Sequence, residues 1–196
     1  MKKIKNLKVY EGMLIIVDMV EGFINKGVLH DQEIKKIVTG QIELIKEARN
    51  NGYAIIFIKD THTKESVEHK RFPDFHCLVG SGEEELIEEL KEYENKEDVY
   101  SISKNSTSFM EALDFRIFAT DASNVKKVEI VGCCTDICVA NGAIGLANFY
   151  DEKNRNVEID VYVDMIATYN EAERRKYVDA ALLLMEQQGI KLVKKK

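Results

Sequence analysis

Short, continuous apolar runs recur along the chain, and polar or helix-like stretches separate them. The runs at 13–17 and 54–58 contain no polar residue, which is typical of strands buried on both faces of a parallel sheet. Four further strands are predicted at 99–103, 128–131, 157–163 and 190–193. Because parallel strands need long crossover connections, this pattern constrains the fold more than any other feature of the sequence.

The segments between these runs place apolar residues near helical spacing. They predict helices at 31–50, 83–93, 108–120, 135–150 and 170–188. Strands that alternate with helices predict an α/β fold: a single three-layer α/β/α domain over residues 1–196, with a six-stranded, mostly parallel, doubly wound (Rossmann-like) sheet. The stretch 60–82 is predicted to be a loop, and a loop of that length in a compact domain is usually functional.

The composition narrows the classes of partner. A length of 196 residues suits one domain, and a net charge of −6 argues against binding to nucleic acid, which needs a basic surface. No apolar run approaches the roughly 20 residues that span a bilayer, and the first residues lack the apolar core of a secretory signal. We therefore expect a cytoplasmic protein that binds neither membranes nor nucleic acid.

Three polar residues follow predicted strands and are candidates for catalysis: Asp18, Lys104 and Cys138. The carboxyl ends of parallel strands lie at one edge of the sheet, so these side chains can converge. A cysteine near a helix start is favoured as a thiolate, a lysine lowers its pKa further, and a carboxylate can accept its proton. The simplest alternative is that Cys138 is a small buried core residue, but its company favours a nucleophile.

The predicted loop carries a second cluster of polar residues. Asp60 and His62 follow a strand two residues apart, and His76 lies fourteen residues further on. One carboxylate and two imidazoles can hold a divalent metal while leaving coordination positions open for water or substrate. Taken alone, an Asp-x-His pair is more often ordinary loop polarity.

Three motifs together resemble a known family. They are Val-Asp-Met-Val-Glu-Gly-Phe at 17–23, Lys-Asn-Ser-Thr at 104–107, and Gly-Cys-Cys-Thr-Asp-Ile-Cys-Val at 132–139. The chain resembles the isochorismatase-like cysteine hydrolases, the superfamily that contains the nicotinamidases, over nearly its whole length.

The resemblance implies a role for each catalytic candidate. Asp18 would be the general base, Lys104 its charge partner and Cys138 the nucleophile. The family also has a cis peptide in the nucleophile turn, which here would join Cys133 to Cys134 and give both a backbone role in an oxyanion-binding loop.

The resemblance also extends to the predicted metal site, which isochorismatases proper lack. The stretch 68–77 is similar to the second half of the nicotinamidase site, and it implies that Asp60, His62 and His76 bind one divalent ion. Zinc is the preferred ion, with iron or manganese as alternatives. Glu68 would approach the ion through water, and we interpret His69 as a surface residue.

Aromatic residues are expected to hold a flat ring in the substrate pocket. Phe23 matches the stacking residue of the family. One residue is inserted before His76 relative to the usual spacing, which leaves Phe72 and Phe75 as alternatives for the other wall. Phe109 is a weaker candidate, whose simpler role is core packing.

These inferences predict a metal-dependent cysteine amidohydrolase, and nicotinamidase is the leading hypothesis: nicotinamide and water would give nicotinate and ammonia through a thioester, in NAD salvage. The family commonly forms homo-oligomers, so we expect one here. An amidase for another small amide, or a hydrolase for an isochorismate-type substrate, is the nearest alternative. A non-catalytic metal or thiol module is a third hypothesis, but adjacent cysteines without a paired Cys-x-x-Cys framework fit it poorly.

Overall fold

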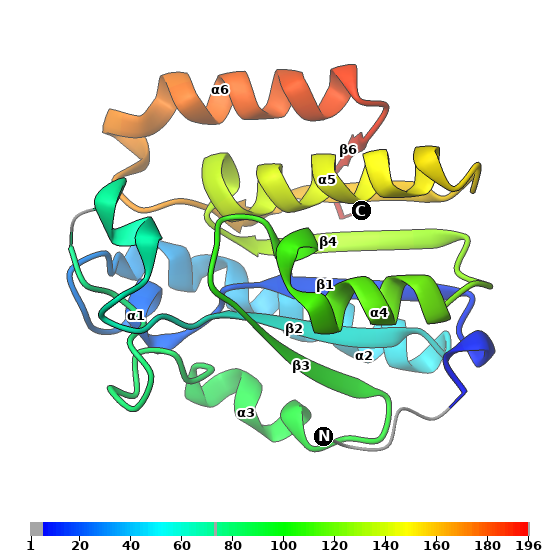
Figure 1. Ribbon diagram of the computed structural model, residues 1–196, viewed down its shortest axis with the longest axis horizontal. Coiled ribbons are helices and arrows are strands. Elements are labelled where there is room, and N and C mark those ends of the chain that lie inside the picture. The colour runs from blue at the N-terminus through cyan, green and yellow to red at the C-terminus, as the bar shows by residue number, and fades with distance from the viewer. Residues whose placement is uncertain (1–5, 73, 196) are drawn as a thin grey trace.

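The computed structural model describes residues 6–72 and 74–195 and contains one six-stranded sheet at its centre (Figure 1). All five strand pairings are parallel, and the order across the sheet is β3-β2-β1-β4-β5-β6. The strands are β1 (Gly12–Val17), β2 (Ala54–Asp60), β3 (Val99–Lys104), β4 (Lys127–Cys133), β5 (Glu158–Ala167) and β6 (Lys191–Val193). The predicted doubly wound α/β fold is confirmed.

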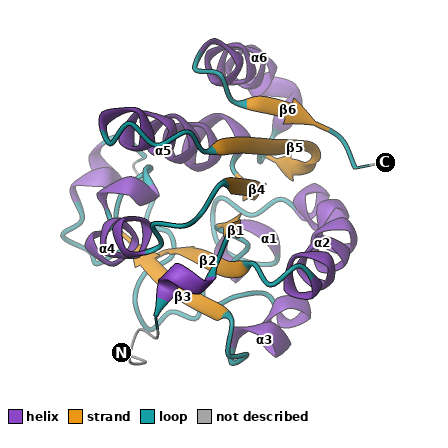
Figure 2. Cartoon of the chain, turned by 90° about the vertical axis from the view of Figure 1, so that its right-hand side faces the viewer, coloured by secondary structure: helices purple, strands orange, loops and turns teal. Residues whose placement is uncertain are grey.

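Helices cover both faces of the sheet (Figure 2). The α-helices are α1 (Glu21–Ile24), α2 (Val38–Asn50), α3 (Glu88–Glu94), α4 (Leu113–Asp121), α5 (Ala140–Glu152) and α6 (Glu171–Gln187). Residues of α1, α2 and α3 pack in one apolar cluster with one face of the sheet, and residues of α4, α5 and α6 pack in a second cluster with the other face. No helix in the described part of the chain is both long and apolar enough to cross a bilayer.

Several helix boundaries differ from the prediction. A 3-10 helix, η2 (Gln32–Ile37), precedes α2, and extended Ala112 separates the 3-10 turn η4 (Phe109–Glu111) from α4. The helix expected at 83–93 begins only at Glu88, because the backbone of 83–86 bonds to residues 20–22 instead: Glu83 O and Glu85 O accept from the amides of that segment, and Leu86 forms an antiparallel bridge with Val20. The helix expected at 135–150 begins as a π-helical turn, η5 (Thr135–Val139). The sequence did not indicate α1 or the 3-10 turns η1 (Leu7–Val9) and η3 (Val67–Lys70).

The central strand β1 explains the all-apolar run at the start of the chain. Every residue of β1 is buried, because side chains on both faces of this strand lie under helices. Burying an aliphatic side chain of this size contributes roughly 1.5–3 kcal/mol, so the alternate residues of β1 stabilise both apolar clusters.

The position of the site follows from the strand order. Strands β1, β2 and β3 extend the sheet in one direction, and β4 then returns to pair with β1 on its other side. Ligand sites of doubly wound sheets lie at the carboxyl ends of the strands beside such a reversal. Asp18 follows β1 at this point, and the turn that carries Cys138 follows β4.

The close approach of β4 to β1 requires Gly132. Its φ is +121°, and a Cβ atom at this position would lie 2.1 Å from the carbonyl oxygen of Val17. Neither backbone can move away without breaking the ladder between the two central strands.

We predict that Gly132→Ala lowers the free energy of unfolding by about 3 kcal/mol or more, since it adds a backbone clash to a strained φ. Gly52→Ala is the matched control, because Gly52 also has a positive φ but a Cβ atom there would meet no atom within 4 Å. The free energy of unfolding of this control should fall by only about 1 kcal/mol. Urea unfolding of both variants measures the difference, and equal losses would contradict the clash.

Candidate active site

A buried lysine joins the two predicted clusters. The Nζ atom of Lys104 lies 2.9 Å from Asp18 Oδ2 and 2.6 Å from Asp60 Oδ1. It also donates to the Cys138 sulfur at 3.5 Å. All four side chains are at most 4% exposed. The structure thus brings Asp18, Lys104 and Cys138 together, as predicted, and adds Asp60 to them.

The ends of the strands set the positions of the side chains in this cluster. Asp60 and Lys104 are the last residues of β2 and β3 and are paired across the sheet, so their side chains start from neighbouring positions. Asp18 follows β1 with a φ of 50°, a left-handed conformation that aspartate tolerates better than most residues, and its amide donates to Ile58 O. Cys138 lies in η5, directly after β4.

The electrostatics of the cluster favour a proton acceptor. Burial raises the pKa of Asp18, the Lys104 ammonium opposes this, and the result is a pKa of about 6. Burial also opposes the charge on Lys104, but the two neighbouring carboxylates outweigh it and raise the lysine pKa well above its ordinary value. Asp18 is therefore ionised at neutral pH and titrates close to the range in which a general base is useful.

The thiol of Cys138 differs from the sequence-based expectation of a thiolate. Burial raises its pKa well above the ordinary value, and Lys104 only partly offsets this. The resting thiol is consequently protonated, and its activation requires transfer of the proton to a neighbouring base. The Asp18 carboxylate, bound to the same ammonium, is placed to accept it.

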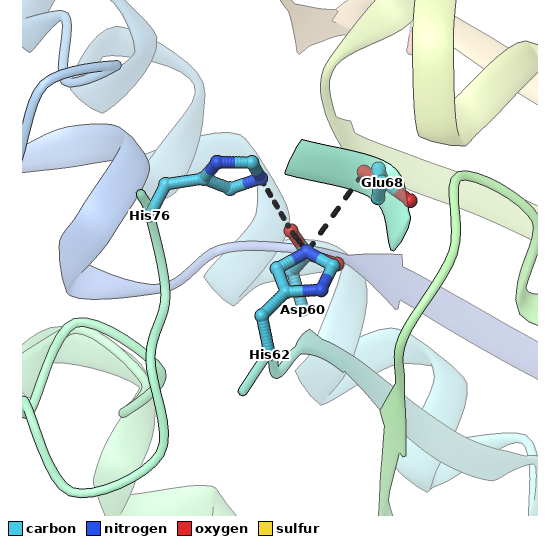
Figure 3. A group of neighbouring side chains, drawn as sticks. All are labelled: Asp60, His62, Glu68 and His76. Atoms are coloured by element: carbon cyan, nitrogen blue, oxygen red, sulfur yellow. Dashed lines mark hydrogen bonds and ion pairs between the residues drawn. The ribbon is translucent and has the colours of Figure 1, made fainter. Parts of the chain in front are cut away.

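Asp60 also belongs to a group of four possible metal ligands (Figure 3). Asp60, His62, Glu68 and His76 are all buried and offer ligand atoms that lie within 4.8 Å of one another. Asp60 Oδ2 is 2.9 Å from His62 Nε2 and 3.5 Å from His76 Nε2. Ligands bound at about 2.1 Å around a tetrahedral ion lie about 3.4 Å apart, so these spacings fit a small cation.

Hydrogen bonds fix the orientation of both imidazoles. His76 Nδ1 lies 2.8 Å from the Asp74 carbonyl oxygen, which can only accept, so Nδ1 donates. His62 Nδ1 lies 2.7 Å from Asn105 Oδ1, which also accepts from the Ser66 hydroxyl, so this Nδ1 donates as well. Each neutral ring therefore turns the lone pair of Nε2 toward Asp60, which is the arrangement of metal-binding histidines.

The charges of the site also call for a cation. Asp18, Asp60 and Glu68 are three buried carboxylates, whereas Lys104 is one ammonium. When both imidazoles are neutral, as metal ligands must be, two negative charges are left uncompensated. Buried charge without a partner is costly, and one divalent ion would balance the site.

The protonation of the ligand residues agrees with this picture. Burial alone would raise the pKa of Asp60, but Lys104 and the two imidazoles hold it well below its ordinary range. Burial opposes the charged form of His62 and His76, yet Asp60 outweighs burial and raises both pKa values. A proton and a metal ion therefore compete for the same Nε2 atoms.

His69 is half-buried, with Nε2 3.2 Å from Thr63 O, and its ring also lies beside the metal group. Its ring centroid is 5.1 Å from that of His62 and 5.2 Å from that of His76, and it also lies against Phe75. Glu68 and His69 both lie in the 3-10 turn η3. The ligand group itself contains Glu68 and not His69.

The aromatic candidates lie in different surroundings. Phe23 is buried with its ring centroid 6.1 Å from that of His76. Phe72 lines a cavity of about 510 Å³ together with Thr107 and Ile137, the residue before Cys138, whereas Phe75 is 53% exposed.

Phe109 is fully buried, and its ring centroid lies 4.7 Å from that of Phe115, so it belongs to the core.

The cysteine-rich turn has the expected backbone. The peptide bond between Cys133 and Cys134 is cis. The thiol of Cys133 donates to the Asp18 carbonyl oxygen at 3.1 Å, and Cys77 is buried, as expected for packing. All four cysteines are free.

Two polar residues of the site were not predicted. Asn105 orients His62, and the only hint in the sequence is its place directly after Lys104. Asp136 precedes the nucleophile by two residues and pairs with Arg174 from α6. Their partners lie far away in the sequence, so neither contact could be read from local spacing.

The pKa of Asp18 predicts the pH dependence of the nucleophile. Below about pH 6, protonated Asp18 cannot accept the thiol proton, so alkylation of Cys138 by iodoacetamide should slow as the pH falls through this value. In the Asp18→Asn variant, Cys138 should be alkylated slowly at all pH values, and the change in rate near pH 6 should disappear. Peptide mass spectrometry after timed alkylation measures both, and an unchanged pH profile in the variant would contradict Asp18 as the base.

Comparisons with known proteins agree with this geometry. The Isochorismatase domain family matches residues 12–195. Nicotinamidase 1 of Arabidopsis thaliana is 30% identical over 139 residues, which cover 64% of this chain and 56% of the plant protein. The chain thus spans little more than half the length of that relative.

Solved structures share the fold over nearly the whole chain. The pyrazinamidase of Pyrococcus horikoshii in complex with zinc aligns with a TM-score of 0.73 and 24% identity, covering 94% of this chain and 99% of the other. The N-carbamoylsarcosine amidase of Thermoplasma acidophilum aligns with a TM-score of 0.71 and 25% identity, covering 94% and 96%. The chain therefore belongs to the isochorismatase family, within which it resembles the nicotinamidases.

Proposed function

We propose that this protein is a metal-dependent cysteine amidohydrolase and that nicotinamide is its substrate. The observation that carries the proposal is the shared carboxylate of Asp60. One of its oxygens binds the ammonium that contacts Asp18 and Cys138, and the other faces the two imidazoles of the metal group. A nucleophile and a substrate-orienting ion would thus act from the two sides of one small site.

The reaction would begin with proton transfer from the Cys138 thiol to Asp18. The sulfur would then attack the carbonyl carbon of the amide, and the backbone N–H groups of Cys134 and Cys138 would bind the oxyanion. Lys104 stays charged throughout, because its raised pKa keeps the proton on Nζ. Its role is to stabilise the negative charge that moves between the thiol and the carboxylate.

Collapse of the tetrahedral adduct would break the carbon–nitrogen bond. Protonated Asp18 would give its proton to the leaving nitrogen, so that ammonia departs and a thioester remains on Cys138. Asp18, again ionised, would then take a proton from water, and the hydroxide would attack the thioester. The carbon–sulfur bond would break, and Asp18 would return the proton to the departing Cys138 sulfur, which gives the free carboxylic acid and the thiol.

Asp60, His62 and His76 would hold the metal ion, with Glu68 near it through water. When bound, the ion would supply a Lewis-acid contact for the ring nitrogen of a pyridine carboxamide, which would orient the substrate more than activate its carbonyl. A set of one carboxylate and two imidazoles suits zinc, which we favour, and also iron or manganese. The cysteine-rich turn and Phe23 would enclose the flat ring, and we favour Phe72 over exposed Phe75 as the other wall because Phe72 lines the cavity beside Ile137.

The described contacts favour this proposal over a metal or thiol module without activity. The metal group consists of oxygen and nitrogen ligands, while Cys133 donates its thiol to a backbone carbonyl and Cys138 contacts Lys104. Another small amide remains the alternative substrate. Nicotinamide hydrolysis would place the protein in NAD salvage in the cytoplasm, and we expect a homo-oligomer as in the family.

We predict that the purified protein releases ammonia from nicotinamide, loses this activity on dialysis against a chelator, and regains it with zinc, iron or manganese. Cys138→Ala should lose activity by about 1,000-fold or more, because it removes the nucleophile. His62→Ala should lose bound metal, whereas His30→Ala, at an exposed histidine outside the site, should keep it.

The assay pairs ammonia release with metal analysis of each variant. Full activity of Cys138→Ala would contradict the cysteine mechanism. Unchanged turnover after proven removal of the metal would contradict the metal site. Hydrolysis of other small amides, with nicotinamide untouched, would replace the substrate and leave the mechanism in place.

A further inference from the structure

Asp136 belongs to the turn that carries the nucleophile, and its side chain ties this turn to residues outside it. The side chain of Asp136 is fully buried and lies in η5, two residues before Cys138. One carboxylate oxygen accepts a hydrogen bond from the Thr168 hydroxyl at 2.8 Å. The other accepts from Arg174 Nη2 at 2.6 Å.

Arg174 is itself held in place on α6, which packs against η5. Its Nη1 donates to the Tyr169 hydroxyl at 3.1 Å, and the guanidinium carbon lies 4.6 Å from the centre of the Tyr169 ring. The ring of Tyr177 lies on it at 5.6 Å. Burial opposes the charge on the guanidinium, but Asp136 outweighs burial and raises the pKa of Arg174, so the guanidinium stays charged.

The turn needs such an anchor because of its own geometry. It is π-helical, a form that is rare and found mostly as single turns at functional sites. The amides of Ile137 and Val139 both donate to Cys134 O, so one carbonyl serves two donors. The buried carboxylate would lack a charged partner without Arg174, and a misplacement of about 1 Å at a reacting group can reduce a rate about 100-fold.

We infer that Asp136 and Arg174, with Thr168, form a clamp that positions Cys138 against Asp18 and Lys104. Arg174 and Asp136 also line the cavity that contains Phe72. In the clamp, Arg174 acts on the thiol through Asp136 and the turn, so it is a positioning residue, and a change in the alkylation rate with little change in KM distinguishes this role from direct contact with the substrate. The inference rests on the proposed function only in that Cys138 is the reactive thiol, and it does not depend on the substrate or the metal.

The test compares two neighbouring arginines of α6. Arg174→Ala removes the clamp, whereas Arg175→Ala removes the same charge from a side chain that is 64% exposed and pairs with Glu171 and Asp179 of the same helix. Arg174→Lys restores the charge without the two-pronged contact to Asp136 and Tyr169. Asp136→Asn keeps the shape of the buried side chain and removes its charge.

Two measurements are made on each variant, at a temperature where circular dichroism shows it to be folded. The first is the rate of Cys138 alkylation by iodoacetamide, followed by peptide mass spectrometry, which needs no amide substrate. The second is kcat and KM for nicotinamide or whichever amide the protein hydrolyses. A failed amidase assay would therefore leave the alkylation test intact.

The clamp predicts that Arg174→Ala and Asp136→Asn slow alkylation and lower kcat by roughly 10-fold or more, with KM changed by less than about threefold. Arg174→Lys should recover part of both rates, and Arg175→Ala should match the unmodified protein. Equal rates for Arg174→Ala and Arg175→Ala would overturn the inference. So would a loss in Arg174→Ala no larger than its loss of folded protein.

Discussion

The ammonium of Lys104, buried between two carboxylates, is the interaction on which the rest of the site depends. It contacts Asp18, Asp60 and Cys138, which are placed by the end of β1, the end of β2 and the turn η5. A buried charge of this kind is stable only when partners surround it, so the lysine specifies how the ends of β1, β2 and β3 must meet. The parallel sheet supplies that meeting point at its carboxyl edge.

Asp60 makes the nucleophile and the metal group one electrostatic unit. Its negative charge contributes to the raised pKa of Asp18, while its second oxygen faces His62 and His76. Any cation bound by the group must therefore also change how readily Asp18 accepts a proton. The π-helical turn completes the unit, since it delivers Cys138 to the same ammonium and is held to α6 through Asp136.

The predictable parts of this arrangement followed from local sequence patterns, from the rule that parallel strands end at one edge of the sheet, and from the family resemblance. Apolar runs predicted the strands, and the polar residues that follow them predicted Asp18, Lys104 and the first metal ligands. The orientation of His62 by Asn105 and the pairing of Asp136 with Arg174 join residues 43 and 38 positions apart, so spacing could not indicate them. The insertion before His76 likewise left Phe72 and Phe75 undecided, and spacing did not indicate that the ring of His69, in η3, lies beside the metal group.

If Cys138 is the nucleophile, it must carry a covalent acyl intermediate during turnover of an amide substrate. Acid quenching during turnover of nicotinamide, followed by digestion and mass spectrometry, would trap this species. We predict one acyl group on the peptide that contains Cys138, removed by hydroxylamine and absent from Asp18→Asn, which cannot activate the thiol. Steady turnover with no acyl group on Cys138, or with the group on Cys133 or Cys134 instead, would contradict the mechanism.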